Sequence, residues 1–150
     1  MPKLEEEINQ KKFKNEHQKL AVNILYTHGW LFSKYLKLLK KHSLTLSQYN
    51  VLRILRGQHP KASTISLLKE RMLDKTPDAS RLVDRLIEKK LVKRNTCSAD
   101  RRRVDVSISQ QGLRALSKLD FIDDEFKVVF KNLKQKEAKG INSLLDKLRG

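Results

Sequence analysis

The chain of 150 residues contains one cysteine, three prolines and five glycines. A lone cysteine, Cys97, excludes an intrachain disulfide framework, and the few glycines argue against a glycine-rich catalytic scaffold. No apolar run approaches the roughly 20 residues that a helix needs to cross a bilayer. Residues 1–7 also lack the basic and then apolar profile of a signal peptide. We therefore expect a cytoplasmic protein with no membrane partner.

Catalytic and metal-binding patterns are absent as well. The four histidines are scattered, with no carboxylate or cysteine at the spacing of metal ligands. Asp120, Asp123 and Asp124 cluster without a metal motif, so we interpret them as a solvated helix face. The sequence has no phosphate loop, nucleophile elbow or dinucleotide fingerprint. We expect no enzymatic activity, no metal and no cofactor.

Positive charge is abundant. The sequence has 33 lysines and arginines and 17 acidic residues, which gives a net charge of +16. A protein this basic usually meets a polyanion, with nucleic acid ahead of an anionic membrane surface. The excess is spread along the chain, so the total charge does not locate a site.

A long helical stripe opens the sequence. Apolar residues recur at helical spacing from Leu4 to Leu39, and Gly29 is a candidate for a bend in this helix. A second stripe runs from Ile141 to Leu148. Together they exceed what a small domain can cover, so we expect a homodimer.

Short helices follow the first stripe. Thr45 and Gln48 fit a capping box for a helix that runs to about Arg56, which Gly57 can close. Ser63 can cap the next short helix.

Another helix begins near Thr76, the expected N-cap, with Pro77 at its first position. Its apolar stripe is Ala79, Leu82, Val83, Leu86 and Ile87. Its other face is polar and consists of Asp78, Ser80, Arg81, Asp84, Arg85 and Glu88.

The period then changes from helical to alternating. Residues 104–108 alternate apolar and polar side chains, which indicates a half-buried strand, and Val92 to Thr96 is its expected partner. The connection from Cys97 to Arg103 is long and polar, so it should project. Ser109 can cap a further helix, whose inward residues are Leu113, Leu116, Phe126, Val129 and Phe130.

Helices followed by a two-stranded wing suit DNA recognition, because the major groove admits an α-helix. Arg81 and Arg85 lie one turn apart, and arginine can bind guanine through two hydrogen bonds. Thr76, Ser80 and the helix N-terminus can hold phosphates. The candidate recognition-helix residues are Lys75, Thr76, Asp78, Ser80, Arg81, Asp84 and Arg85. The alternative is a solvated face on which Asp84 and Glu88 pair with the arginines.

The projecting loop supplies further candidates. Arg101, Arg102 and Arg103 repel one another in the free protein and are favoured beside a phosphate ladder or in a narrow minor groove. Asp100 would repel phosphate, so we expect it to hydrogen-bond a neighbouring arginine.

The run from Asp100 to Ser109 resembles the wing signature of the MarR family of bacterial transcriptional regulators, an Asp, two basic residues and alternating apolar residues ending near Thr. Gln110-Gln111-Gly112 continues that signature, and Arg81 to Leu86 is similar to the core of the family's recognition helix. The resemblance covers residues 45–120 in detail. It implies a homodimer with interlocked terminal helices, a palindromic operator, and Asp100 and Arg102 as the wing pair, with Arg102 in the minor groove.

One departure concerns Lys90, where the family commonly has Gly at a position that often needs φ > 0. We therefore expect the helix end to differ here. Many family members also sense a small, often aromatic ligand between the dimer helices and the DNA-binding region. Either His17, Tyr26, Trp30 and Tyr35 line such a crevice, or they are ordinary core and interface residues.

These observations predict a mainly α fold with a small two-stranded β wing, a winged helix-turn-helix. We expect a single domain over 1–150, with a DNA-binding core at 45–110 and dimerisation helices at 1–42 and 111–150. The expected function is that of a nucleoid-associated bacterial repressor that binds double-stranded DNA sequence-specifically and is released by a small molecule. Two alternatives stay open, a sequence-nonspecific architectural DNA-binding protein and a basic helical protein-interaction module.

Overall fold

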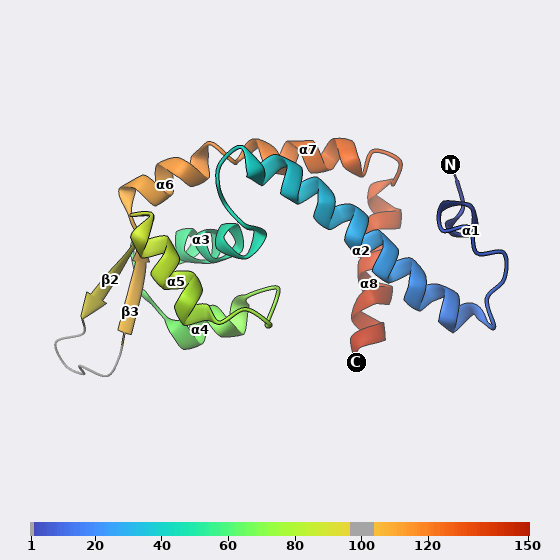
Figure 1. Cartoon of the computed structure of the whole chain (residues 1–150), viewed down its shortest axis with the longest axis horizontal. Coiled ribbons are helices and arrows are strands. Elements are labelled where there is room, and N and C mark those ends of the chain that lie inside the picture. The colour runs from blue at the N-terminus through green and yellow to red at the C-terminus, as the bar shows by residue number, and fades with distance from the viewer. Residues whose placement is uncertain (1, 97–103) are drawn as a thin grey trace.

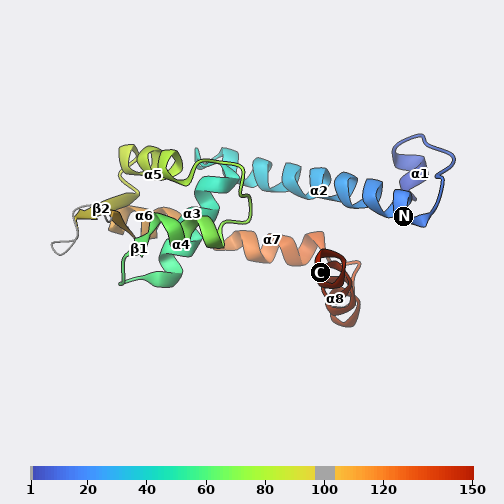
Figure 2. The same ribbon diagram turned by 90° about the horizontal axis from the view of Figure 1, so that it is seen from below.

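A computed structural model describes residues 2–96 and 104–150, and it has a mainly helical fold with a small sheet (Figure 1). The sheet and the short helices gather at one end of the molecule. The long helix α2 (Glu16–Lys40) leads away from them toward the N-terminus, and the chain reaches its C-terminus through two later helices (Figures 1 and 2). The other helices are α1 (Leu4–Glu7), α3 (Leu46–Gln58), α4 (Ile65–Arg71), α5 (Ala79–Glu88), α6 (Gln110–Ser117), α7 (Phe121–Val129) and α8 (Gln135–Arg149). The strands are β1 (Ser63–Thr64), β2 (Val92–Thr96) and β3 (Val104–Ile108).

The N-terminal helix is interrupted, but not where the sequence suggested. Helix α2 runs unbroken through Gly29, and the interruption lies between α1 and α2. There Asn9 adopts a left-handed φ of 53°, and the Asn15 side chain caps α2 by accepting from the Gln18 N–H at 2.9 Å. Asparagine favours both roles, whereas one glycine costs a long helix only about 1 kcal/mol.

The capping box at Thr45 is confirmed. Thr45 Oγ1 accepts from the Gln48 N–H at 3.1 Å, and Gln48 Oε1 accepts from the Thr45 N–H at 3.2 Å. Helix α3 continues past the expected stop at Gly57 to Gln58. His59 follows as the C-cap with a non-helical backbone, because a residue before proline is pushed out of the helical region.

Two other predicted caps are wrong by one or two residues. Helix α4 is capped by Thr64, which accepts from the Leu67 N–H at 3.1 Å, while Ser63 is buried in β1. Helix α5 is capped by Asp78, whose carboxylate accepts from the Ser80 N–H at 2.8 Å, and not by Thr76.

The predicted pairing of β2 with β3 is confirmed, with Val92 opposite Ile108 and Arg94 opposite Val106. The sheet has a third strand, since β1 pairs with the other edge of β3 in the antiparallel order β1-β3-β2. A strand of two residues is too short to show an alternating pattern, so the sequence predicted only the two strands of the wing.

The helix expected after Ser109 is two helices. Ser109 caps α6 as predicted, and the chain turns at residues 118–120 before α7. The turn buries Leu119 and Ile122 completely, which the single-helix interpretation missed, and it leaves Phe130 42% exposed.

One hydrophobic core holds these elements together. It takes Leu39 from the end of α2, and its other large, fully buried side chains are Val51, Leu52, Leu55, Leu68, Val83, Leu86, Val106, Leu116, Leu119 and Ile122. Helix α8 contributes no buried residue. Among the described residues, no helix is both long and apolar enough to span a membrane.

The sequence suggested that the end of α5 would change, because Lys90 stands where glycine is common. In the structure Lys90 nevertheless adopts the left-handed conformation. Lys90 has φ = 59°, its N–H donates to Ile87 O at 2.8 Å, and the Leu91 N–H donates to Leu86 O at 2.9 Å. This pair of bonds is a Schellman motif, and Leu86 and Leu91 are both buried beside it. The motif therefore holds a lysine where glycine would be unstrained.

Replacing Lys90 with glycine should stabilise the fold by about 1 kcal/mol, because a side chain in the left-handed region costs roughly that much. Urea unfolding of Lys90→Gly measures the gain. The control is Lys90→Ala, which also removes the lysine side chain but keeps a Cβ at the left-handed φ of 59° and so relieves no strain. Lys90→Gly would contradict this account if it were no more stable than Lys90→Ala.

Candidate nucleic-acid interface

Helix α5 is anchored by one face and exposed on the other. Its buried residues are Ala79, Leu82, Val83 and Leu86. Its exposed residues are Ser80, Arg81, Asp84, Arg85 and Glu88, and the capping Asp78 is exposed as well. The stripes follow the sequence prediction, except that Ile87 is only partly buried. The result is a core-anchored helix that presents a polar face to solvent.

The two arginines of this face have no ion pair with any described residue. The expected alternative partner, Asp84, instead accepts a hydrogen bond from Arg94 of β2, at 2.6 Å between Asp84 Oδ1 and Arg94 Nη2. Glu88 forms no ion pair within the described part of the chain either. Among these residues, Arg81 and Arg85 are therefore available to an external anion.

Lys75 and Thr76, which the sequence also offered as DNA contacts, take part in the loop before α5. The Lys75 ammonium donates to the carbonyl oxygens of Lys69, at 2.8 Å, and Glu70, at the C-terminus of α4. The Thr76 N–H donates to Asp74 Oδ1 at 2.9 Å, and the hydrogen bonds from Thr76 lower the pKa of the Asp74 carboxyl. Residues 75 and 76 therefore lie before α5, which begins at Ala79 with Asp78 as its N-cap. The Lys75 ammonium is hydrogen-bonded within the protein.

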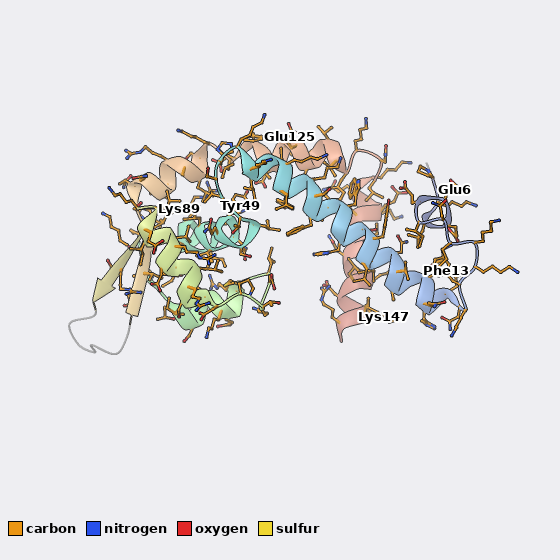
Figure 3. The ribbon with its side chains drawn as sticks, in the orientation of Figure 1. Glu6, Phe13, Tyr49, Lys89, Glu125 and Lys147 are labelled. Atoms are coloured by element: carbon orange, nitrogen blue, oxygen red, sulfur yellow. The ribbon has the colours of Figure 1, made fainter. Side chains whose placement is uncertain are left out.

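The far end of α5 is tied to the turn that follows α2. Lys89 Nζ donates to Ser43 O at 2.5 Å and to Gln48 Oε1 at 3.2 Å (Figure 3 labels Lys89). A helix fixed at its C-terminus and along its buried stripe holds its exposed face in a defined orientation.

The acidic cluster on α7 is more than a solvated face. Arg56 of α3 pairs with Asp120 at 2.7 Å, and Arg53 pairs with Asp123 at 3.4 Å. Both pairs are substantially exposed, so each contributes little to stability. They join the short-helix end of the molecule to the helix that leads to the C-terminus.

The hairpin β2–β3 projects beside α5 (Figure 1). Its described end carries the exposed residues Lys93, Arg94 and Asn95. The predicted wing residues Asp100, Arg101, Arg102 and Arg103, together with Cys97, lie outside the described residues. The sequence did not single out Arg94, because Arg94 lies on a strand and its partner Asp84 on a helix, and no helical or strand periodicity links the two.

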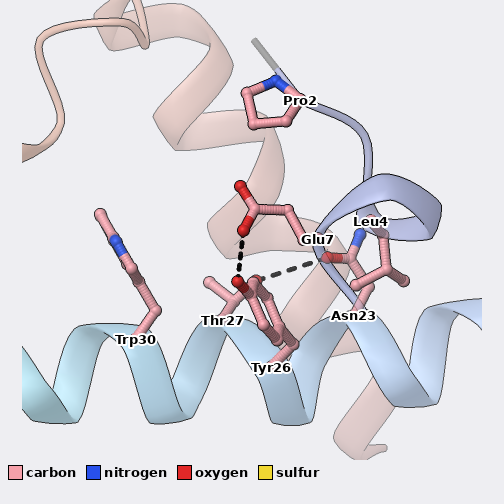
Figure 4. A pocket seen from close by; sticks show the side chains of 7 residues that line it. All are labelled: Pro2, Leu4, Glu7, Asn23, Tyr26, Thr27 and Trp30. Carbon is pink, nitrogen blue, oxygen red and sulfur yellow. Dashed lines mark hydrogen bonds between the residues drawn. The ribbon is translucent and has the colours of Figure 1, made fainter. Parts of the chain in front are cut away.

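The four residues proposed for a ligand crevice do not converge. Tyr26 and Trp30 line a pocket of about 480 Å³ between α1 and α2, together with Pro2, Leu4, Glu7, Asn23 and Thr27 (Figure 4). Tyr26 Oη donates to Glu7 Oε2 at 2.6 Å, and this hydrogen bond raises the pKa of the tyrosine. His17 is exposed, and Tyr35 packs on Phe126 with ring centroids 4.3 Å apart.

Comparison with known proteins gives one consistent result. Residues 42–103 match the model of the MarR family. A MarR transcription factor from Planctomyces limnophilus is 26% identical, with 90% of this chain and 98% of that chain covered and a TM-score of 0.69. No match was found among curated proteins.

Two further solved structures share the fold. Bordetella bronchiseptica BpsR, whose structure addresses regulation of DNA binding by 6-hydroxynicotinic acid, is 21% identical over 93% of this chain and 98% of that chain, with a TM-score of 0.78. MepR of S. aureus, in a complex with DNA, is 18% identical over 85% and 92%, with a TM-score of 0.74.

Proposed function

We propose that the protein is a transcriptional repressor that binds double-stranded DNA sequence-specifically, because its residues 42–103 match the model of the MarR family. The observation that carries the proposal is the exposed arginine pair of α5, Arg81 and Arg85, on a helix anchored along its other face. Such a helix fits the major groove, where an arginine distinguishes guanine by binding both O6 and N7. We assign the exposed Ser80 hydroxyl to a phosphate, whereas the Ser80 N–H is already bound by the Asp78 carboxylate.

The wing supplies the second part of the proposal. We assign Arg101 and Arg103 to phosphates and Arg102 to the minor groove, with Asp100 holding Arg102. Contacts to phosphate position a protein on DNA without specifying sequence, so the wing contributes affinity and α5 contributes specificity.

Dimerisation completes the proposal. Helix α2 exposes Leu25 by 71%, and α8 exposes Leu144 by 67% and Leu148 by 57%. Large apolar side chains left exposed on two helices are typical of a surface that a second copy buries. A two-fold dimer places two α5 helices on one duplex, so the operator should be an inverted repeat with half-sites about one helical turn apart.

Leu144→Lys should turn the dimer into a monomer, because it places a charge in the proposed apolar interface. Light scattering at micromolar concentration measures the mass. Ser143→Lys is the matched control, since it adds the same charge to the other side of α8 and should leave the dimer intact. A wild-type protein that stays a folded monomer under these conditions would refute both the dimer and the inverted repeat.

A small aromatic molecule is the signal we propose for release from DNA. The support is the Tyr26 and Trp30 pair in the pocket beside α1, and BpsR is a relative of the same fold whose structure concerns such a molecule.

The function is tested by selecting bound fragments of genomic DNA from the source organism with the purified protein. Enrichment of an inverted repeat supports a regulator. Enrichment of bent or A·T-rich fragments without a repeat would favour an architectural DNA-binding protein. Failure to retain any fragment would favour a module that binds proteins.

A further inference from the structure

The negative charge of Asp84 lies in the middle of the proposed DNA-reading face. It follows Arg81 by three residues and immediately precedes Arg85, and all three side chains are exposed. A free carboxylate at this place would repel phosphate. It could also pair with Arg81, since residues three apart on a helix are neighbours.

Arg94 prevents both effects. Its guanidinium binds Asp84 at 2.6 Å, and the two side chains keep 50% and 53% of their surface exposed. A hydrogen bond between two charged groups at this distance is among the stronger kinds. Exposed ion pairs nevertheless add little to stability, so the contribution of this pair to folding is small.

The strand geometry makes this contact specific. Side chains two apart on a strand share a face, so Arg94 projects on the same side of β2 as Val92, which is 2% exposed and belongs to the core. Arg94 also pairs with Val106 in the ladder of the hairpin. The bond to Asp84 therefore joins the recognition helix to the strand that leads into the arginine-rich loop.

We infer that Arg94 is a positioning residue for DNA binding, which acts by neutralising Asp84 and by fixing β2 against α5. This inference rests on the proposed DNA-binding function and adds a residue to it. Arg94 leaves Arg81 and Arg85 available to DNA, and it holds β2 beside the exposed face of α5. Its effect passes through Asp84.

A double-mutant cycle tests the inference. Binding to a labelled duplex of mixed sequence at low salt is measured for wild type, Arg94→Met, Asp84→Asn and the double variant. Arg94→Met should weaken binding about tenfold, because it leaves a carboxylate facing phosphate. In the Asp84→Asn background, the same change should alter binding by less than about threefold, because the repelling charge is gone.

Two outcomes would overturn the inference. A loss of equal size in both backgrounds would mean that Arg94 itself touches DNA, and no loss in either would mean that the pair is idle. Circular dichroism confirms that each variant is folded at the temperature of the assay. Arg94→Lys is the second variant, which keeps the charge with fewer donors and should bind between wild type and Arg94→Met.

The cycle also separates this inference from the proposed function. If the wild-type protein does not bind the duplex, the proposed function and the role of Arg94 both fail. If the wild type binds but the cycle is additive, DNA binding stands and only the role of Arg94 is rejected.

Discussion

Gly112→Ala should destabilise the protein by at least about 3 kcal/mol, because overpacking of a rigid backbone contact is among the most damaging core substitutions. A Cβ at this buried position would lie 2.1 Å from Leu91 O and 2.7 Å from Cγ1 of Ile108. Leu91 cannot withdraw easily, since its carbonyl accepts the Ser109 N–H at 3.0 Å. Urea or thermal unfolding measures the loss.

Gly57→Ala is the matched control. Gly57 lies inside α3, and a Cβ there would meet no atom within 4 Å. Alanine is the better helix former, so this variant should gain up to about 1 kcal/mol. A similar stability for both variants would mean that α6 does not pack on the end of α5 as the structure has it.

The duplex enriched by the genomic selection is called the selected duplex. Arg85→Ala should weaken binding to it by about 1–3 kcal/mol and change binding to a scrambled duplex very little, if Arg85 contacts a base. Salt titrations on both duplexes measure the difference. Lys136→Ala removes one charge from α8, far from α5 (Figure 1), and should leave both affinities nearly unchanged. Equal losses on both duplexes for Arg85→Ala would mean that α5 does not read sequence.

The wing arginines should behave differently. Arg101→Ala and Arg103→Ala should weaken both duplexes alike and lower the salt slope by about one unit, because each removes one phosphate contact. Arg102→Ala should show its largest loss on duplexes with A·T-rich flanks, where a narrow minor groove attracts arginine. A selective loss on the selected duplex for Arg101 or Arg103 would assign base contacts to the wing.

Local patterns in the sequence predicted much of the fold. The capping box at Thr45, the buried stripe of α5 and the pairing of β2 with β3 depend on residues close together in the chain. The errors came from contacts between distant or competing groups. Asp74 accepts from the Thr76 N–H while Asp78 caps α5, and β1 pairs with the edge of β3 that β2 leaves open.

The candidate site shows the same division. The polar face of α5 could be predicted from helical spacing, because its exposed residues alternate with a core stripe. The engagement of Lys75 with the end of α4, and of Asp84 with Arg94, could not, because both depend on how the chain folds back on itself. At Lys90 the Schellman hydrogen bonds and the buried Leu86 and Leu91 outweigh the local preference for glycine.

Discrimination between the selected duplex and a scrambled one, measured for the wild-type protein across a salt series, tests the central claim most directly. If the arginine face of α5 reads base edges, the selected duplex should bind at least about 10³-fold more tightly. Both affinities should fall with salt while that preference persists, because phosphate contacts are common to both duplexes. Equal affinity for the two duplexes at every salt concentration would contradict the claim.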